Sequence, residues 1–473
     1  MKTIILSGVS ALAMFAAAPA MGQSNSTVNQ TGSNSSVGVT QGATGGSNVS
    51  VVNQAATNGS NVTVDQTATA GAANDSLVGQ AATASNSRTE VLQTGAGNDS
   101  DVDQRGDNSL VDVTQNGTGN ASTVFQGAAS AAVRTTVGQT GSRNTSDVGQ
   151  VGVSSTIDVT QSNAAAGTTG NNSVVDQAGA FSSVNVTQNG QENDSTVNQL
   201  AGLADVTVDQ DGEGNTSTVN QAGLGSFVDV EQSGMTNTSN VLQVGASSVI
   251  DVSQIGDDNS SEIVGLADGS DATVTQSGTG NSSEISQAAA RQRTQILGPI
   301  YANLPVNEND SATVTQTGAD HVSTISQYGR DQTAIVEQTG TGNQSVGSGN
   351  SPVGIMQIGR EQYAKVVQGG SANSSTVMQG TGQTDLILAS SSRGNDAMVT
   401  QNGTGGSSYV AQDGVNSTAT LMQGGTDNES TILQAGTGVA NMATVTQGSV
   451  GNISSVSQSG GGHIATVSQN AGM

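Results

Sequence analysis

A glutamine recurs every eleven residues through the middle of the chain, and this period constrains the fold more than any other feature. A single gap, between Gln254 and Gln276, spans two periods, and Gly265 stands where the missing glutamine would be. A period this strict indicates a repeat architecture, in which each repeat is one supersecondary unit. The glutamines of this regular block are Gln177, Gln188, Gln199, Gln210, Gln221, Gln232, Gln243, Gln254, Gln276 and Gln287.

Between the glutamines, residue types alternate with a period of two, which is typical of a strand with one inward and one outward face. One strand type reads Asn-x-Ser-x-Val-x-Gln, as from Asn193 to Gln199. The other reads Ser-x-Val-x-Val-x-Gln, as from Ser182 to Gln188. Because the two types alternate, the true unit is two strands, or twenty-two residues. A glycine usually follows two places after the glutamine and indicates a turn.

This pattern predicts an all-β fold, a β-solenoid of about twenty strand-turn-strand rungs with cross-β stacking. Stacking one rung on the next places like residues side by side, roughly 4.8 Å apart. At that spacing, side-chain amides can hydrogen-bond along the stack as ladders. The ladder residues are the ten glutamines named above together with Asn193, Asn215, Asn237, Asn259 and Asn281.

The order of residues from Ser182 to Gln199 resembles the curlin repeat, the unit of bacterial curli fibre subunits. The resemblance extends over nearly the whole chain after residue 22 and involves about eight positions per unit. It implies a secreted functional amyloid that polymerises with itself into extracellular, cell-surface fibres, serving biofilm matrix and surface adhesion. It further implies a nucleator, an outer-membrane secretion pore with accessory proteins, and a role for the ladder residues in assembly.

Four segments are expected along the chain. Residues 1–22 read as a secretory signal peptide, with Lys2 before an apolar run and small residues near a cleavage site. Residues 23–298 and 310–473 hold the repeats, and the second block is more degenerate, with Ser390 expected in place of a ladder glutamine. Pro299 and Pro305 interrupt strand pairing and indicate an insertion loop over 299–309. This loop is either a contact site for an export or anchoring partner or a tolerated insertion.

Composition excludes several classes of protein. The chain has no cysteine, no tryptophan and an aromatic content of 2%, which is too low for an ordinary globular core of 473 residues. A formal net charge of -26 argues against nucleic acid as a partner. No stretch after the signal peptide is apolar enough for an integral membrane span. The glycine-rich composition alone would suggest disorder, but the periodicity favours an ordered repeat.

No pattern of catalytic or metal-binding residues is evident, so we expect no enzyme and no cofactor. The two histidines, His321 and His463, occupy a ladder position and read as polar substitutions. The carboxylates are scattered over outward positions, and the calcium-binding β-roll pattern is missing. The alternative function is a non-polymerising secreted β-solenoid that acts as an adhesin or binds a surface or polysaccharide.

Overall fold

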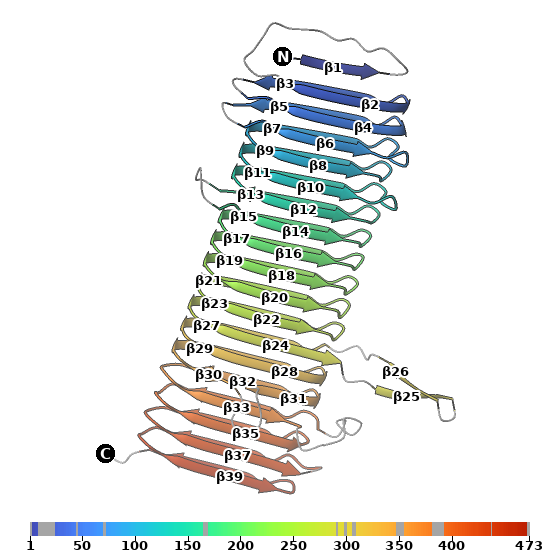
Figure 1. Ribbon diagram of the computed structural model, residues 1–473. Coiled ribbons are helices and arrows are strands. Elements are labelled where there is room, and N and C mark those ends of the chain that lie inside the picture. The colour runs from blue at the N-terminus through green and yellow to red at the C-terminus, as the bar shows by residue number, and fades with distance from the viewer. Residues whose placement is uncertain are drawn as a thin grey trace. The chain divides into compact units, whose positions relative to one another are not determined.

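The computed structural model describes residues 2–7, 24–43, 46–69, 72–163, 169–289, 292–297, 300–304, 309–346, 354–380, 392–436 and 438–470. The chain divides into two units, Met1–Met235 and Thr236–Met473. Every regular element among the described residues is a β-strand (Figure 1). In each unit, the strands belong to two sheets, and the chain passes from one sheet to the other at each turn.

The first unit contains nine rungs, each with one strand in either sheet. The strands of one sheet are β2 (Asn25–Ser33), β4 (Val49–Asn58), β6 (Asp75–Gln80), β8 (Asp99–Gln104), β10 (Ala121–Gln126), β12 (Thr145–Gln150), β14 (Asn172–Gln177), β16 (Asp194–Gln199) and β18 (Thr216–Gln221). Those of the other are β3 (Ser36–Ala43), β5 (Asn61–Ala68), β7 (Arg88–Ala96), β9 (Leu110–Thr118), β11 (Arg134–Ser142), β13 (Thr156–Ser162), β15 (Ser183–Gln191), β17 (Asp205–Glu213) and β19 (Phe227–Met235).

The second unit also contains nine rungs. One sheet has β20 (Thr238–Gln243), β22 (Ser260–Gly265), β24 (Ser282–Ala289), β28 (Val322–Arg330), β30 (Gln344–Ser345), β31 (Ile355–Arg360), β33 (Ser374–Gln379), β35 (Ser407–Gly414), β37 (Glu429–Gly436) and β39 (Ile453–Ser459). The other has β21 (Val249–Asp257), β23 (Asp271–Thr279), β27 (Ser311–Ala319), β29 (Thr333–Thr341), β32 (Tyr363–Gln368), β34 (Asp396–Gln401), β36 (Thr418–Gln423), β38 (Met442–Gln447) and β40 (Ile464–Gln469). Strands β30 and β31 share one rung, because both pair with β28.

Strands of successive rungs pair in parallel and in register, so that identical residue types lie side by side. Between β16 and β18, for example, Ser195 pairs with Ser217 and Val197 with Val219. Because side chains alternate along a strand, this register places the same column of residues on the inward face of every rung. The inward column of β16 is fully buried, whereas the outward residues between its members are exposed or half-buried.

The interior between the two sheets is thin, because each strand supplies only one or two branched apolar side chains. Val197 on β16 and Val208 on β17 are each 0% exposed. The inward positions on either side of them are held by serine, asparagine and glutamine. The two units are therefore β-solenoids with a mixed apolar and amide interior. The predicted fold class is confirmed, although the number of rungs is about eighteen rather than twenty.

Insertions between rungs leave the stack continuous. Across the insertion after β24, strand β23 pairs with β27 and β24 pairs with β28 in register. Within this insertion, β25 (Gln292–Leu297) and β26 (Ile300–Leu304) form an antiparallel two-stranded sheet. The loop expected over 299–309 thus overlaps a hairpin, and its prolines lie outside the described residues. Whether this segment contacts a partner stays a prediction, as do the four segment boundaries.

Two further expectations concern the second block and the N-terminus. Ser390 lies outside the described residues, and no ladder gap arises there, since Gln368 donates directly to Gln401 at 2.9 Å. At the N-terminus, β1 (Lys2–Ser7) pairs antiparallel with β3. Most of the predicted signal peptide lies outside the described residues.

The turn glycine two places after a ladder glutamine is required by close approach of successive rungs. At Gly212, φ is +120°, and an added Cβ would lie 2.0 Å from the carbonyl oxygen of Gly234. We expect Gly212→Ala to lower the free energy of unfolding by well over ~1 kcal/mol, because the backbone must shift and its φ is unfavourable for alanine. Urea unfolding of the full chain, followed by circular dichroism, measures this loss.

Gly38→Ala is the matched control. An added Cβ at Gly38 meets nothing within 4 Å, and its φ is outside the left-handed region. This variant should be as stable as the parent. Equal losses for the two substitutions would show that close stacking at the turn does not require glycine.

Candidate functional site

The ladder glutamines are hydrogen-bonded from rung to rung through their side-chain amides. In one sheet of the first unit, Gln188 Nε2 donates to Gln210 Oε1 at 2.8 Å, and Gln210 donates to Gln232 at the same distance. In the facing sheet, Gln199 accepts from Gln177 at 2.8 Å and donates to Gln221 at 2.9 Å. In every such pair, the earlier rung donates and the later rung accepts. Each ladder therefore has a direction.

In most ladder glutamines, the second amide hydrogen links the two sheets. Gln188 Nε2, on β15, also donates to the carbonyl oxygen of Asn172 at the start of the facing strand β14, at 2.8 Å. It lies 3.1 Å from the carbonyl oxygen of Asn193 in the turn that follows. Gln210 makes the equivalent bond to Asp194 at 3.0 Å. One side chain thus ties successive rungs, facing strands and a turn together, which fixes its rotamer and satisfies an otherwise costly buried amide.

The asparagine ladder runs along the turn that follows β15, which contains Asn193, and it has the opposite direction. Asn193 Oδ1 accepts the backbone N–H of Asn215 at 3.1 Å and its Nδ2 at 3.2 Å. Asn215 Nδ2 in turn reaches the carbonyl oxygen of the turn glycine Gly234 at 3.0 Å. In the second unit, Asn259 and Asn281 repeat this arrangement. Here the earlier rung accepts and the later rung donates.

The structure places every predicted ladder residue inside one of the two solenoids, at most 2% exposed. These residues are Gln177, Gln188, Asn193, Gln199, Gln210, Asn215, Gln221 and Gln232 in the first unit, and Asn237, Gln243, Gln254, Asn259, Gln276, Asn281 and Gln287 in the second. Gly265 interrupts one ladder, and Gln243 Nε2 there donates to the carbonyl oxygen of Ser248 at 2.9 Å. The role of these residues in assembly stays a prediction.

The sequence pattern identified a second inward polar position, the serine just before each strand of the sheet that contains β15, but it missed the residues that replace this serine in the second unit. In the first unit, this column holds mostly serine, as at Ser182 and Ser226. In the second unit, the equivalent positions include Asp310, Gln332 and Gln362, all at most 1% exposed. These residues could have been found from the sequence. Gln332 and Gln362 lie five residues after a ladder glutamine, and Asp310 lies at the end of an insertion.

Asp310 is the one carboxylate in this buried column. Its Oδ1 accepts the backbone N–H of Gln332 at 2.9 Å, and its Oδ2 has no hydrogen-bond partner. Burial raises the pKa of Asp310 from 3.8 to about 6, against the lowering effect of the hydrogen bond from Gln332. The nearby Asp331 adds to the rise. At neutral pH, the second unit therefore holds a poorly compensated buried charge.

His321 replaces a ladder asparagine and keeps its hydrogen bonds. Its backbone N–H donates to Asn281 Oδ1 at 3.2 Å, and its Nε2 lies 3.2 Å from the carbonyl oxygen of Thr317. Because that oxygen only accepts, Nε2 carries the proton, and Nδ1 accepts the backbone N–H of Asn343 at 3.2 Å. Desolvation lowers the pKa of His321. The imidazole is thus held neutral as an acceptor.

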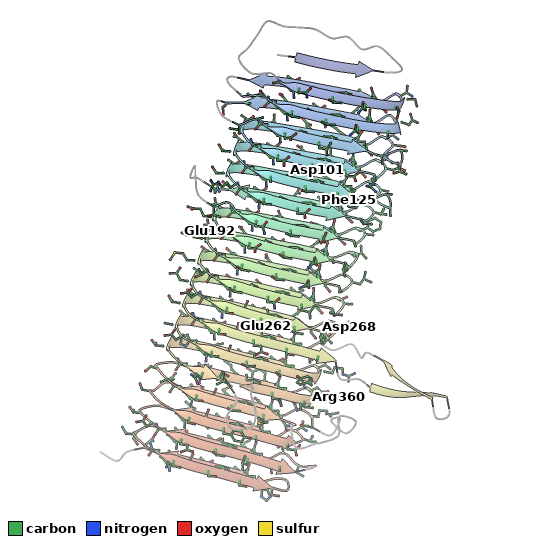
Figure 2. All side chains as sticks on the ribbon, in the orientation of Figure 1. Asp101, Phe125, Glu192, Glu262, Asp268 and Arg360 are labelled. Atoms are coloured by element: carbon green, nitrogen blue, oxygen red, sulfur yellow. The ribbon has the colours of Figure 1, made fainter. Side chains whose placement is uncertain are left out.

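Charged side chains gather on the outward faces and turns (Figure 2). Asp101 projects from β8 and Glu262 projects from β22, whereas Glu192 lies in a turn. Burial and the neighbouring Asp99 raise the pKa of Asp101. Among the described residues, no group of three or more His, Cys, Asp or Glu side chains could hold a metal ion. The described part of the chain also has no helix long and apolar enough to cross a membrane.

Comparison with protein families identifies the repeat. The curlin associated repeat matches residues 204–234, 308–340 and 414–448. The chain therefore contains the curlin associated repeat. Each match covers strands and turns of the ladder architecture described above, in both units. A search of curated proteins finds no match. The predicted resemblance to the curlin-repeat family is confirmed.

Within a curlin repeat, the ladder glutamine contributes much more to the free energy of unfolding than the inward serine of the same strand does. We expect Gln199→Ala to lower the free energy of unfolding by about 3 kcal/mol or more, because it removes bonds to Gln177, Gln221 and Ala204 and leaves a cavity. Ser195→Ala should change stability by less than about 1 kcal/mol, since the buried Ser195 hydroxyl has no partner. Chemical unfolding of both variants tests this. A larger loss at Ser195 would contradict the role assigned to the amide.

The buried carboxylate predicts a pH dependence of the second unit. Because the folded pKa of Asp310 is raised from 3.8 to about 6, the folded state binds the proton more tightly, and stability is lost as pH rises through about 6. Asp310→Ser, which restores the residue of Ser270, should stabilise the second unit at pH 7.5 by on the order of 2–3 kcal/mol. The gain should shrink towards pH 4.5.

Hydrogen exchange of the strands β27 and β29 measures this local stability as a function of pH. Glu284→Gln, on an exposed outward position of β24, is the control and should show no such dependence. A pH-independent gain for Asp310→Ser would contradict a buried ionised carboxylate.

Proposed function

We propose that this protein is a structural subunit of an extracellular, curli-like amyloid fibre that grows by rung-on-rung strand addition. The fibre would serve biofilm matrix and surface adhesion. The observation that carries the proposal is the direction of the ladders, which makes the N-terminal end of the first unit complementary to the C-terminal end of the second. The family match and the predicted signal peptide over residues 1–22 support secretion.

At the C-terminal end, the last rung presents amide donors. Gln458 and Gln469 accept from Gln434 and Gln447, each at 2.8 Å. Their Nε2 atoms donate to the carbonyl oxygens of Met442 and Ile453, at 2.9 and 3.0 Å. In inner rungs, the other Nε2 hydrogen reaches the next glutamine. Both glutamines therefore have a hydrogen available for a following rung.

At the N-terminal end, the first rung presents amide acceptors. Gln30 and Gln41 donate to Gln54 and Gln66, at 2.7 and 2.8 Å. Gln41 is 3% exposed, yet its Oε1 has no hydrogen-bond partner. In later rungs, this oxygen accepts from the preceding glutamine. Removal of the predicted signal peptide would also free the edge of β3 that β1 occupies in the full chain.

A second copy can satisfy these groups only head to tail. Gln469 and Gln458 of one copy meet Gln41 and Gln30 of the next as donor to acceptor, whereas two like ends bring donor to donor. A heterologous contact of this kind leaves open ends and produces a filament. The unpaired backbone groups of the terminal strands also favour strand pairing between copies. The proposal includes self as partner, a nucleator, and an outer-membrane pore with accessory proteins for export, and it assigns no catalytic activity.

A second candidate function, a non-polymerising surface-binding solenoid, is favoured by one edge of the first unit. The turns 151–155, 178–182, 200–204 and 222–226 contain no charged residue. They expose large apolar side chains on successive rungs, and Phe181, Leu200 and Leu203 are 59–66% exposed. Exposed apolar patches of this kind mark interaction sites. The remaining apolar members are Val151, Val153 and Leu224.

Assembly of the purified chain tests the fibre function. Residues 23–473, diluted from denaturant over a range of concentrations, should form fibres that bind thioflavin and diffract at the ~4.8 Å strand spacing. Triple replacement of Gln188, Gln210 and Gln232 by alanine should slow fibre growth more than replacement of the outward Thr187, Asp209 and Glu231. A folded β-rich monomer that never polymerises would contradict the fibre function and favour surface binding. Equal slowing by the two triple variants would remove the ladder from the assembly mechanism.

A further inference from the structure

The two terminal rungs are unusual in this acidic chain because they carry almost no titratable side chain. The chain has 37 Asp and Glu residues, yet none lies in the first rung, 24–43, or in the last, 452–470. The last rung contains one titratable side chain, His463, and the first contains none. A head-to-tail junction between copies would thus contain a single titratable side chain.

His463 repeats the hydrogen bonds of the buried His321. Its backbone N–H donates to Asn441 Oδ1 at 3.1 Å, as that of His321 does to Asn281. Its Nε2 lies 2.9 Å from the carbonyl oxygen of Ser459, four residues back, as that of His321 lies near Thr317. In both rings, Nε2 must therefore be the donor and Nδ1 the acceptor in the neutral form.

The partner of Nδ1 distinguishes the two histidines. His321 Nδ1 accepts the backbone N–H of Asn343 from the next rung, at 3.2 Å. His463 lies in the last described rung, and in the proposed head-to-tail fibre the rung stacked on it belongs to another copy. The residue just before the corresponding strand of the first rung, β3, is Ser35. In the same column, Ser60 N–H donates to Ser35 Oγ at 3.2 Å. A stacked copy would present the backbone N–H of Ser35 to His463.

We propose that His463 is the acceptor that receives the next copy at the C-terminal end, and that its protonation closes this end to growth. The inference rests on the proposed fibre function and adds its regulation. A protonated imidazole carries hydrogen on both nitrogens, so Nδ1 would face the incoming N–H as donor to donor. The positive charge would also be desolvated at the junction. Fibre growth should therefore slow as the medium is acidified.

Neighbouring titratable groups lie away from this contact. In the rung below, Glu429 begins β37 and pairs with Ile453, whereas His463 stacks on the turn that follows the other end of β37. On the incoming copy, Asp65 belongs to the second rung, where it pairs with Thr40 of the first. Among the described residues, neither the strands β38, β39 and β40 nor the turn 459–463 has another titratable side chain.

Seeded elongation of the full mature chain tests the proposal. Wild type and His463→Asn are each grown on their own fibre seeds at pH 7.5 and 5.5. At pH 7.5, the two rates should agree within about twofold, because asparagine Oδ1 accepts the same N–H in the pair of Asn441 with His463. At pH 5.5, wild type should elongate about tenfold more slowly than His463→Asn, the effect of one lost bond and an unpaired donor. The ratio of the wild-type rate to the His463→Asn rate at each pH removes the effects of acid on the carboxylates, because both proteins share them.

His321→Asn is the matched control, since this position lies inside the stack and not at its end. It should keep the pH dependence of wild-type elongation, normalised to its rate at pH 7.5. Identical pH profiles for wild type and His463→Asn would overturn the inference while leaving the fibre function intact. Failure of every variant to form fibres at either pH would overturn the fibre function and this inference with it.

Discussion

The structure depends on the side-chain amide placed where it cannot reach water. A buried primary amide offers two donors and two acceptor positions. Leaving these groups unpaired costs more free energy than the burial of the apolar side chains contributes. The neighbour that satisfies them at the strand spacing is another amide in the same position of the next rung. The Gln188, Gln210 and Gln232 ladder meets this condition, and the bond from Gln188 to Asn172 uses the remaining hydrogen. The requirement explains both the strict period and the in-register pairing.

The same constraint defines what the chain tolerates. Extra residues in turns leave the ladders unchanged, as where Gln276 donates to Gln316 across the largest described insertion at 2.8 Å. Two polar substitutions in the interior preserve an acceptor facing the next rung. His321 does so through Nδ1, and Asp310 does so through Oδ1, although at the cost of burying a charge. Specificity of stacking thus resides in hydrogen-bond direction more than in apolar shape.

Much of the fold could be predicted from the sequence, because the same types of inward residue recur from rung to rung. The strand code alone placed Asn193, Val197 and Gln199 on one inward face, and these residues are buried as expected. Periodicity could not specify that the glutamine and asparagine ladders point in opposite directions, since direction depends on which amide atom faces which rung. Nor could it distinguish the serine column from its polar continuation at Gln332 and Gln362, where the repeat code is broken. The hairpin of β25 and β26 was missed because two prolines indicated a loop.

The most direct test of the central claim is the hydrogen exchange of the side-chain amides, measured by nuclear magnetic resonance on selectively labelled protein. If the ladders hold the rungs together, the Nε2 protons of Gln188 and Gln210 exchange as slowly as the backbone amides of β15 and β17. The half-buried Gln191, at the end of β15 and outside the ladders, then exchanges rapidly and serves as the internal reference. Ladder amides that exchange as fast as Gln191, within strands whose backbone is protected, would contradict the account.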